Sequence, residues 1–408
     1  MLDRISVRAI GGAVPGREWV RPASTIAAGV LAAAALGKVG PVSAQVGRAF
    51  GLSPFALGAT ISLITLLGAV LAAPAGQWLR DRDPRPWLAA GLAVMAVAGG
   101  AMILAPPSRA ALIGLRAAEG AGYLLIVVGG PGALVRQVSA ARARAALALW
   151  GICTPAGLAV SAAAGGLAAS RAGWQVWFAA LAAACAVLAG VVLALARGRR
   201  QGAPAAPPPG DRRRPPLAGA LLLACGFGAL SLMAVAILSL LPTYLIQRGL
   251  PAAAAGAATA AAAAASIPGN ACAAALLRRG ARPGPLACSM LACPALAAVT
   301  FARAVPLPTA VGAAALLVFA VGIAASAAYA SLPEVTRSRY DLPLANGIMI
   351  QLGSVGGLIG PPVFAAVTGL RHWQLIAYLA IPAVIVGAAA TASATLARHR
   401  AGAGSQPG

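Results

Sequence analysis

The chain has 408 residues, of which 60% are hydrophobic and 10% charged, with a net charge of +23 and a mean hydropathy of +0.85. Soluble domains carry roughly 45–50% apolar and about 25% charged residues, so this composition excludes a water-soluble protein and indicates an integral membrane protein. The basic charge does not predict a nucleic-acid partner, because the arginines are spread over many short segments instead of one patch. Anionic lipid headgroups are the partners that we expect for them.

Apolar stretches of about 20 residues follow one another along the chain, which is the length at which an α-helix crosses the hydrocarbon core. They are too long and too continuous for the strands of a membrane barrel. We predict twelve membrane-spanning helices, at residues 22–44, 55–78, 87–105, 110–134, 145–169, 174–196, 217–245, 252–276, 284–304, 308–332, 343–368 and 373–397. The span at 252–276 has the weakest signal, because it consists mostly of Ala.

The breaks between these stretches alternate in charge. Of the 31 basic residues, 23 lie in every second break or in the tails, six lie in the other breaks, and Lys38 and Arg116 lie within apolar stretches. Because Arg and Lys near membrane ends are retained in the cytoplasm, the pattern predicts a multi-pass protein of the cytoplasmic (inner) membrane with both termini inside. The same alternation supports the span at 252–276, since without it every later loop would change sides. Residues 1–21 lack the apolar core of a cleavable signal peptide.

A segment rich in Arg and Pro interrupts the apolar pattern at residues 197–216. We predict that it is a flexible or extended cytoplasmic linker, because Pro blocks helix formation. It separates six spans in residues 22–196 from six in residues 217–397, between cytoplasmic tails at 1–21 and 398–408. This is the plan of transporters built from two repeated halves. We therefore predict an all-α membrane protein of twelve transmembrane helices, in two six-helix halves related by pseudo-twofold symmetry.

The break between the second and third spans reads GQWLRDRDPRP, residues 76–86. It resembles a cytoplasmic loop of the major facilitator superfamily, in which Gly and three residues precede Asp-Arg, one residue, Gly and basic residues. Asp81, Arg82 and Arg85 match this pattern, whereas Gly76 is displaced by one position and Pro replaces the second Gly. The resemblance implies that Asp81 bridges to neighbouring helix ends and holds the cytoplasmic side shut; the alternative is a solvated loop acid.

The fourth span holds a charged pair and two glycines in the run Arg116-Ala-Ala-Glu119-Gly120-Ala-Gly122. Charges within a bilayer helix must be satisfied, and residues three apart share a helix face, so we predict that Arg116 pairs with Glu119. The run resembles the Arg-x-x-x-Gly-x-Gly pattern of the same superfamily, in which Gly120 and Gly122 would serve helix packing. Glu119 is the candidate proton carrier if transport is proton-coupled, and the alternative is a permanently ionised structural pair.

Lys38 is the only lysine in the chain. It lies about 24 Å from the inner end of the first span, so about one turn below the outer surface of the membrane core. Two interpretations remain open: its ammonium reaches the outer headgroups, or it faces a central cavity and contacts an anion. In the break near residue 337, we expect Glu334 and Asp341 to pair locally with Arg337 and Arg339.

The resemblance covers nearly the whole chain and implies a secondary transporter that works by alternating access on a small-molecule substrate, with protons as the coupling ion, as a monomer. We predict an organic or inorganic anion, because Lys38 and Arg116 outnumber Glu119 within the spans. The fourth-span pattern together with Gly-Trp-Gln at 173–175 weakly resembles the cyanate-permease-like anion permeases.

Two alternatives compete with this interpretation. One is proton-coupled efflux of hydrophobic drugs. The other is a polytopic membrane enzyme, which we disfavour because no nucleophile and base set, metal cluster or phosphate-binding loop can be assembled from the two His and eight acidic residues. The six cysteines form no CxxC pair, so no metal site and no cofactor are expected.

Overall fold

A computed structural model describes residues 17–104, 108–197, 217–336, 341–369 and 371–403. Helices account for nearly all of this part of the chain, and no β-strand occurs in it. The helices before residue 198, called here the N-terminal helices, are α1 (Arg17–Gly37), α2 (Ser43–Ala49), α3 (Pro54–Leu79), α4 (Pro84–Leu104), α5 (Arg109–Gln137), α6 (Ala140–Trp150), α7 (Cys153–Arg171) and α8 (Trp174–Arg197). A short 3-10 turn, η1 (Gly40–Val42), joins α1 to α2.

The helices after residue 216 are called here the C-terminal helices. They are α9 (Leu217–Gln247), α10 (Ala252–Ala264), α11 (Ser266–Arg278), α12 (Pro283–Ala287), α13 (Cys293–Phe301), α14 (Leu307–Val335), α15 (Leu342–Thr368) and α16 (Leu375–Ala403), with the 3-10 segment η2 (Cys288–Ala292) between α12 and α13. Among the described residues, eleven helical stretches are long and apolar enough to cross a membrane, and Leu375–Thr391 within α16 is a shorter apolar stretch. The all-helical membrane architecture is thus confirmed. The Ala-rich prediction at 252–276 corresponds to the stretch Ala254–Arg278.

Besides the first span, which breaks after Gly37 at the end of α1, three of the predicted spans are interrupted helices. The fifth breaks between α6 and α7, the eighth at Ala265 between α10 and α11, and the ninth at η2. Each break lies two to four residues before a proline, at Pro155, Pro268 and Pro294. Because proline has no N–H to donate to the carbonyl four residues earlier, the helix is weakest just before it. Proline alone does not fix the breaks, because Pro131 and Pro242 lie inside the continuous helices α5 and α9.

Side chains cap the starts of α3 and α5. The Ser53 hydroxyl accepts a hydrogen bond from the Ala56 amide at 3.2 Å, and the Ser108 hydroxyl accepts one from the Ala111 amide at 3.4 Å. Such caps satisfy amides that have no partner in the first turn. At the other end of α15, Gly369 has a φ of 55°, in the left-handed region that glycine adopts without strain.

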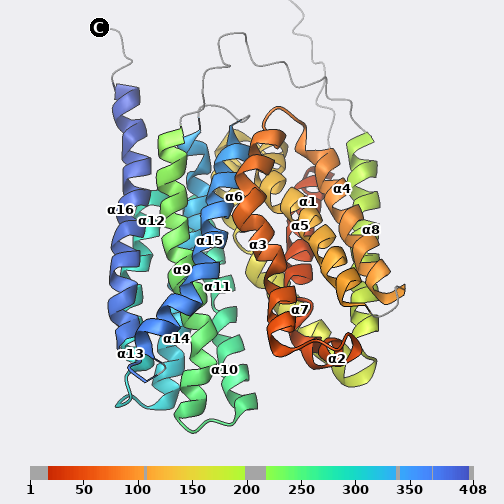
Figure 1. Cartoon of the computed structure of the whole chain (residues 1–408). Helices are drawn as coiled ribbons and strands as arrows, with labels where there is room; N and C mark the ends of the chain where they lie inside the picture. The colour runs from red at the N-terminus through yellow and green to blue at the C-terminus, as the bar shows by residue number, and fades with distance from the viewer. Residues whose placement is uncertain (1–16, 105–107, 198–216, 337–340, 370, 404–408) are drawn as a thin grey trace, which may run out of the picture.

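The two groups of helices lie side by side (Figure 1). The start of α1, the end of α8 and the start of α9 lie at one end of the bundle, which we call the linker end, and the opposite end is called the far end. One buried apolar cluster lies wholly within the C-terminal helices. A larger one fills the N-terminal helices and continues into α9, α14 and α15, so the two groups share a packed interface.

The hydrogen bonds and ion pairs recorded between the described residues of the two groups all lie in the linker-end half of the membrane spans. On one side of the interface, the Ala73 amide donates to Gln351 Oε1 at 2.9 Å, and Asn346 Nδ2 donates to the carbonyls of Val127 and Val128 at 2.9 and 3.0 Å. On the other side, Ser326 Oγ donates to the Ala148 carbonyl at 3.0 Å. Toward the far end, the ribbons of α3 and α10 diverge (Figure 1).

Candidate functional site

Three charged side chains meet inside the N-terminal helices: Lys38, just after α1, and Arg116 and Glu119 on α5. We call them the charged triad. Their exposed fractions are 1%, 0% and 1%. Arg116 Nη1 lies 2.9 Å from Glu119 Oε2, and Lys38 Nζ forms an ion pair with the other oxygen, Oε1. The predicted contact between Arg116 and Glu119 is therefore present, and a second cation shares the carboxylate.

Arg116 also binds the backbone at the end of α1. Its Nη1 donates to the Ala35 carbonyl at 3.0 Å, its Nη2 to the Leu36 carbonyl at 3.5 Å, and its Nε to the Thr60 carbonyl of α3 at 3.3 Å. Because α1 ends at Gly37, the carbonyls of its last turn have no partner within the helix. Arg116 thus caps α1 and ties α1, α3 and α5 together.

Lys38 does not reach the headgroups, so that interpretation of it is wrong. Its side chain is 2% exposed, its Nζ lies 4.1 Å from the centre of the Phe178 ring and 3.5 Å from Met102 Sδ. The backbone carbonyl of Lys38 accepts a hydrogen bond from Trp177 Nε1 at 3.2 Å. The small hollow around the Lys38 and Glu119 side chains is lined by residues of α1, α4, α5 and α8 only. The triad therefore lies within the N-terminal group and does not line the interface with the C-terminal helices.

The glycines of the fourth-span pattern lie where helices approach closely. A Cβ atom on Gly122 would come within 2.6 Å of the Gly91 carbonyl oxygen on α4, and one on Gly120 would overlap the Leu67 side chain on α3. At residue 122 only glycine leaves room, because the neighbour is backbone, whereas the Leu67 side chain beside Gly120 can move. Gly120 and Gly122 thus bring α5 against α3 and α4 beside the charged triad.

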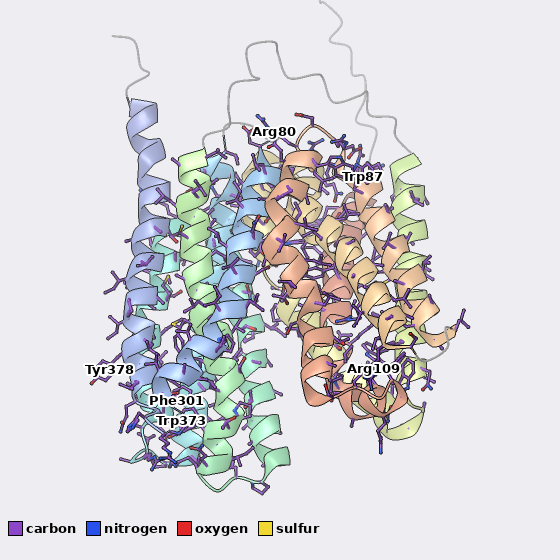
Figure 2. All side chains as sticks on the ribbon, in the orientation of Figure 1. Arg80, Trp87, Arg109, Phe301, Trp373 and Tyr378 are labelled. Atoms are coloured by element: carbon purple, nitrogen blue, oxygen red, sulfur yellow. The ribbon has the colours of Figure 1, made fainter. Side chains whose placement is uncertain are left out.

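At the linker end, an ion pair joins the two groups of helices. Arg80, which follows α3, binds Asp341, which precedes α15: Nε lies 2.8 Å and Nη2 2.7 Å from Oδ1. Arg80 lies at this end in Figure 2. Beside it, a Cβ on Gly76 would overlap the Pro343 carbonyl oxygen, so the backbones of α3 and α15 touch there.

The predicted bridging residue Asp81 is exposed and takes part in none of the ion pairs found among the described residues. Arg80 makes the bridge in its place, which the family pattern did not indicate. Arg82 packs over the Trp78 ring, with its guanidinium carbon 4.4 Å from the ring centre, and Arg85 pairs with Asp83 at 2.7 Å.

The ion-pair cluster expected near residue 337 is also different. Asp341 binds Arg80, and Glu334 lies 3.4 Å from Arg144. The other two expected members, Arg337 and Arg339, are outside the described residues.

Asp83 is the acidic group of this loop whose pKa departs from its ordinary value of 3.8. Partial burial raises the pKa of Asp83, but hydrogen bonds from the Arg85 side chain and amide, together with the Arg85 charge, outweigh that effect and lower it. Asp83 is therefore ionised throughout the physiological range.

A second contact between the two groups is uncharged. Ser326 Oγ of α14 contacts the Ala148 carbonyl of α6 across the interface. Within the C-terminal group, the same hydroxyl lies 2.6 Å from Asn270 Oδ1 of α11. Asn270 Nδ2 donates to the Ser266 carbonyl at 2.6 Å. A Cβ on Gly151 would lie 2.7 Å from Asn270 Oδ1, so the break after α6 makes room for this polar contact.

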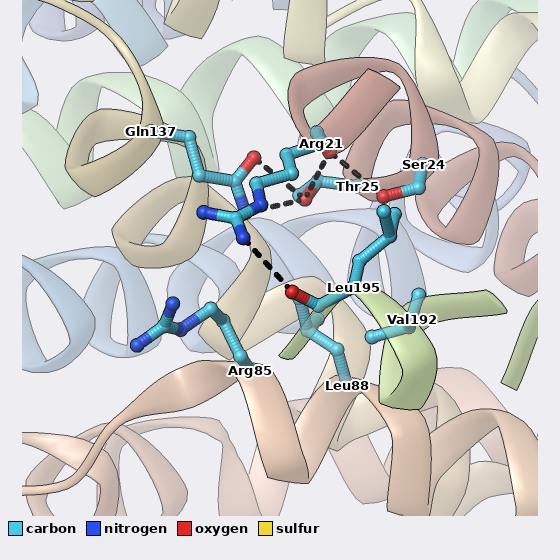
Figure 3. Close-up of a pocket in the computed structure, with 8 residues that line it drawn as sticks. All are labelled: Arg21, Ser24, Thr25, Arg85, Leu88, Gln137, Val192 and Leu195. Carbon is cyan, nitrogen blue, oxygen red and sulfur yellow. Dashed lines mark hydrogen bonds between the residues drawn. The ribbon is translucent and has the colours of Figure 1, made fainter. Parts of the chain in front are cut away.

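A small hollow opens among α1, α4, α5 and α8 at the linker end (Figure 3). Arg21 Nη2 donates to the Leu195 carbonyl at 3.0 Å, and Thr25 bonds Gln137 at 3.2 Å. The hollow has a volume of about 20 Å³, which is enough for one water molecule. It joins the start of α1 to the end of α8 and is too small for a solute. No group of His, Cys, Asp or Glu that could hold a metal ion occurs in the described part of the chain.

Comparison with known proteins places these features in a family. The chain matches the Major Facilitator Superfamily over residues 25–340. No curated protein matches its sequence. Among solved structures, it resembles the E. coli fucose:proton symporter FucP, which was crystallised in the outward conformation, with a TM-score of 0.67 and 16% identity over 91% of this chain and 98% of that one.

Two further structures are similar. The human organic anion transporter MFSD10 (TETRAN) has a TM-score of 0.70 and 16% identity, over 92% of this chain and 100% of that one. The proton:xylose symporter XylE, bound to 6-bromo-6-deoxy-D-glucose, has a TM-score of 0.69 and 12% identity, over 91% of this chain and 95% of that one. At these identities the likeness concerns the fold, whereas the family match spans most of the sequence. The chain is a transporter that belongs to the Major Facilitator Superfamily.

Proposed function

We propose that this protein moves a small, uncharged polar solute across the cytoplasmic membrane by alternating access, coupled to the movement of protons. The observation that carries the proposal is the distribution of contacts between the two groups of helices. All of the recorded hydrogen bonds and ion pairs between them lie toward the linker end, which the arginine pattern assigns to the cytoplasm. Such an arrangement is closed inside and fits the outward-facing stage of a transport cycle.

Similar contacts at the far end support two repeated halves of six helices. In the N-terminal group, Arg109 donates to the carbonyls of Phe50 and Gly51. In the C-terminal group, Arg248 donates to the carbonyls of Ala302 and Val305 at 3.2 and 2.9 Å. Each arginine thus fastens one loop to a neighbouring helix. This fits two stiff units that rock about their shared interface.

An aromatic side chain of the last span in each group packs beside these arginine contacts. The Trp174 ring lies 5.6 Å from the Phe50 ring, and the Trp373 ring lies 5.9 Å from the Phe301 ring. Phe301 and Trp373 lie together at the far end in Figure 2. The similar packing of their far ends therefore supports two repeated halves.

The argument for an anionic solute rested on Lys38 and Arg116 as cations that face the substrate. Both are bound to Glu119 inside the N-terminal group, so they are not available to an anion at the interface. Polar side chains at the described interface include the amides of Asn270, Asn346 and Gln351 and the hydroxyl of Ser326, which suit an uncharged solute with hydroxyl groups. FucP and XylE are named for sugars, which agrees with this class.

The charged triad is the proposed proton-coupling site. It is the one group of ionisable side chains that the described residues bury completely within the apolar spans, and buried charges in a membrane protein are retained chiefly for function. It also contacts the break at the end of α1, so a change in its protonation can alter a helix that packs near the interface.

The direct test is thermal stabilisation of the purified protein by three panels of compounds: neutral sugars and polyols, carboxylates and inorganic anions, and hydrophobic cationic dyes. A compound that stabilises the protein is then tested for uptake into proteoliposomes with and without an imposed pH gradient. We expect a neutral polyol to bind and its uptake to follow the gradient. Stabilisation by anions alone, or uptake that ignores the pH gradient, would contradict the solute class or the coupling, respectively.

A further inference from the structure

The charged triad contains two cations and one carboxylate in an enclosed site. With all three ionised, it carries one net positive charge in apolar surroundings, where an uncompensated charge is costly. The site becomes neutral if one of the cations gives up its proton. Which side chain does so can be argued from the contacts that each makes.

Arg116 and Glu119 hold each other in place. A guanidinium does not lose its proton in proteins, and Arg116 is further held by the carbonyls of Ala35, Leu36 and Thr60. Glu119 Oε2 therefore always faces a permanent cation at 2.9 Å. Protonating Glu119 would leave that cation buried without its anion, which adds to the charge of the site instead of removing it.

Lys38 is the side chain that can change. Among the described residues, its only charged neighbours are Glu119 and Arg116, both on α5. The groups that face it from α4 and α8 are apolar except for one thiol: Met95, Gly99, Met102, Phe178, Ala182 and Cys185. Neither α4 nor α8 supplies a second carboxylate, and α1 has no other titratable side chain near it. An uncharged Lys38 leaves a neutral pair of Arg116 and Glu119, to which its amine can still donate a hydrogen bond.

We propose that Lys38 Nζ, and not the Glu119 carboxylate, is the atom of the charged triad that binds and releases the exchangeable proton. In this cycle, the amine takes a proton from water on one side of the membrane and becomes an ammonium paired with Glu119 Oε1. It returns the proton to water on the other side. The inference deepens the proposed function, because it names the proton acceptor within the coupling site.

The position of Lys38 explains how protonation could move a helix. Lys38 lies between the end of α1 at Gly37 and η1, which begins at Gly40. Its carbonyl is held by Trp177 of α8, whereas its ammonium is held by α5. A change in the bond between Nζ and Glu119 therefore acts on the break in the first span, where the backbone has no continuous helical hydrogen bonding.

The sequence allows a direct measurement, because Lys38 is the only lysine in the chain. Protein grown with lysine labelled with ¹⁵N and ¹³C will give a single side-chain signal, whose shift distinguishes amine from ammonium. Lys38→Arg removes the signal and so confirms its assignment. We expect the signal of an amine to convert to that of an ammonium as the pH falls from about 9 to about 5. In Glu119→Gln, the conversion should need a lower pH.

An ammonium signal that persists from about pH 5 to about pH 9 would overturn the proposal. If Glu119→Gln does not fold, the dependence of thermal stability on pH decides. With an amine in the folded protein, the unfolded chain binds one more proton, so wild-type stability rises with pH relative to Lys38→Met by up to tenfold in the folding equilibrium per pH unit. Parallel pH profiles of the two proteins would reject the proposal. Neither measurement needs a substrate, so a failed transport assay and a failed titration remain distinguishable.

Discussion

Arg80 and Asp341 are 261 residues apart in the sequence, yet their side chains meet with Nη2 2.7 Å from Oδ1. The side chains are 16% and 7% exposed, so water screens the pair only partly. It stands where α3 of the N-terminal group meets α15 of the C-terminal group. An ion pair at this position exists only while the linker end is closed, so it favours that conformation over the open one.

Loss of this ion pair should shift the protein toward a conformation open at the linker end. We expect Arg80→Gln or Asp341→Asn to remove about 1 kcal/mol of preference for the closed end, a change of about fivefold in the equilibrium. Hydrogen–deuterium exchange at the linker ends of α3 and α15 should rise in either variant. The exchanged pair Arg80→Asp with Asp341→Arg should restore protection, and protection that is unchanged in both single variants would refute the role.

Arg144→Gln is the matched control for that experiment. Arg144 also pairs across the two groups, with Glu334, but its side chain is 53% exposed and the distance is 3.4 Å. Exposed pairs of this kind contribute little to stability. We therefore expect Arg144→Gln to leave the exchange rates of α3 and α15 close to those of the wild type.

Close backbone contact at the linker end predicts a second effect. A Cβ on Gly76 would overlap the Pro343 carbonyl, and a Cβ on Gly347 would overlap the Ala72 carbonyl. Gly76→Ala and Gly347→Ala should each cost about 1–3 kcal/mol in the closed conformation, because backbone cannot yield as a side chain can. Gly100→Ala on α4, where a Cβ meets nothing within 4 Å, is the control. Equal melting temperatures for the three variants would show that the contact does not matter.

Much of this architecture could be predicted from the sequence, because a bilayer forces apolar stretches into helices. The breaks within spans could not, since prolines also lie inside continuous helices such as α5 and α9. The contact of Arg116 with Glu119 was predictable as well, since three positions along one helix fix its geometry. The partners of Lys38 and Arg80 were not. Those contacts join residues 81 and 261 positions apart, and the charge pattern of a single sequence carries no information on which distant helices pack together.

The loop between α3 and α4 has a pH dependence that can be separated from that of transport. The pKa of Asp83 is below 3.8 in the folded protein. Its bond with Arg85 therefore adds stability that is fully present at pH values above the pKa of Asp83 in the unfolded chain. This stability is lost as the pH falls through the pKa of Asp83 in the folded protein. Wild type and Asp83→Asn should therefore differ at neutral pH, by less than about 1 kcal/mol because the pair is partly exposed. Their melting temperatures should converge once the pH has fallen below the pKa of folded Asp83, whereas a difference that persists in the acid limit would contradict the assignment.

The unequal contacts of the two buried cations predict unequal effects on stability. Lys38→Met leaves Arg116 and Glu119 as a neutral pair. The main interaction that this variant lacks is the bond between Lys38 Nζ and Glu119 Oε1. Arg116→Met leaves Lys38 with the carboxylate, but it removes the side-chain donor from the carbonyls of Ala35 and Leu36 in the last turn of α1. A buried acceptor without a partner costs about 1–3 kcal/mol. We therefore expect Arg116→Met to be less stable than Lys38→Met by about 1–3 kcal/mol, measured as a lower unfolding midpoint in detergent. Similar midpoints would mean that water replaces the guanidinium at the end of α1. The only stabilising contact of Arg116 would then be the one with the Glu119 carboxylate.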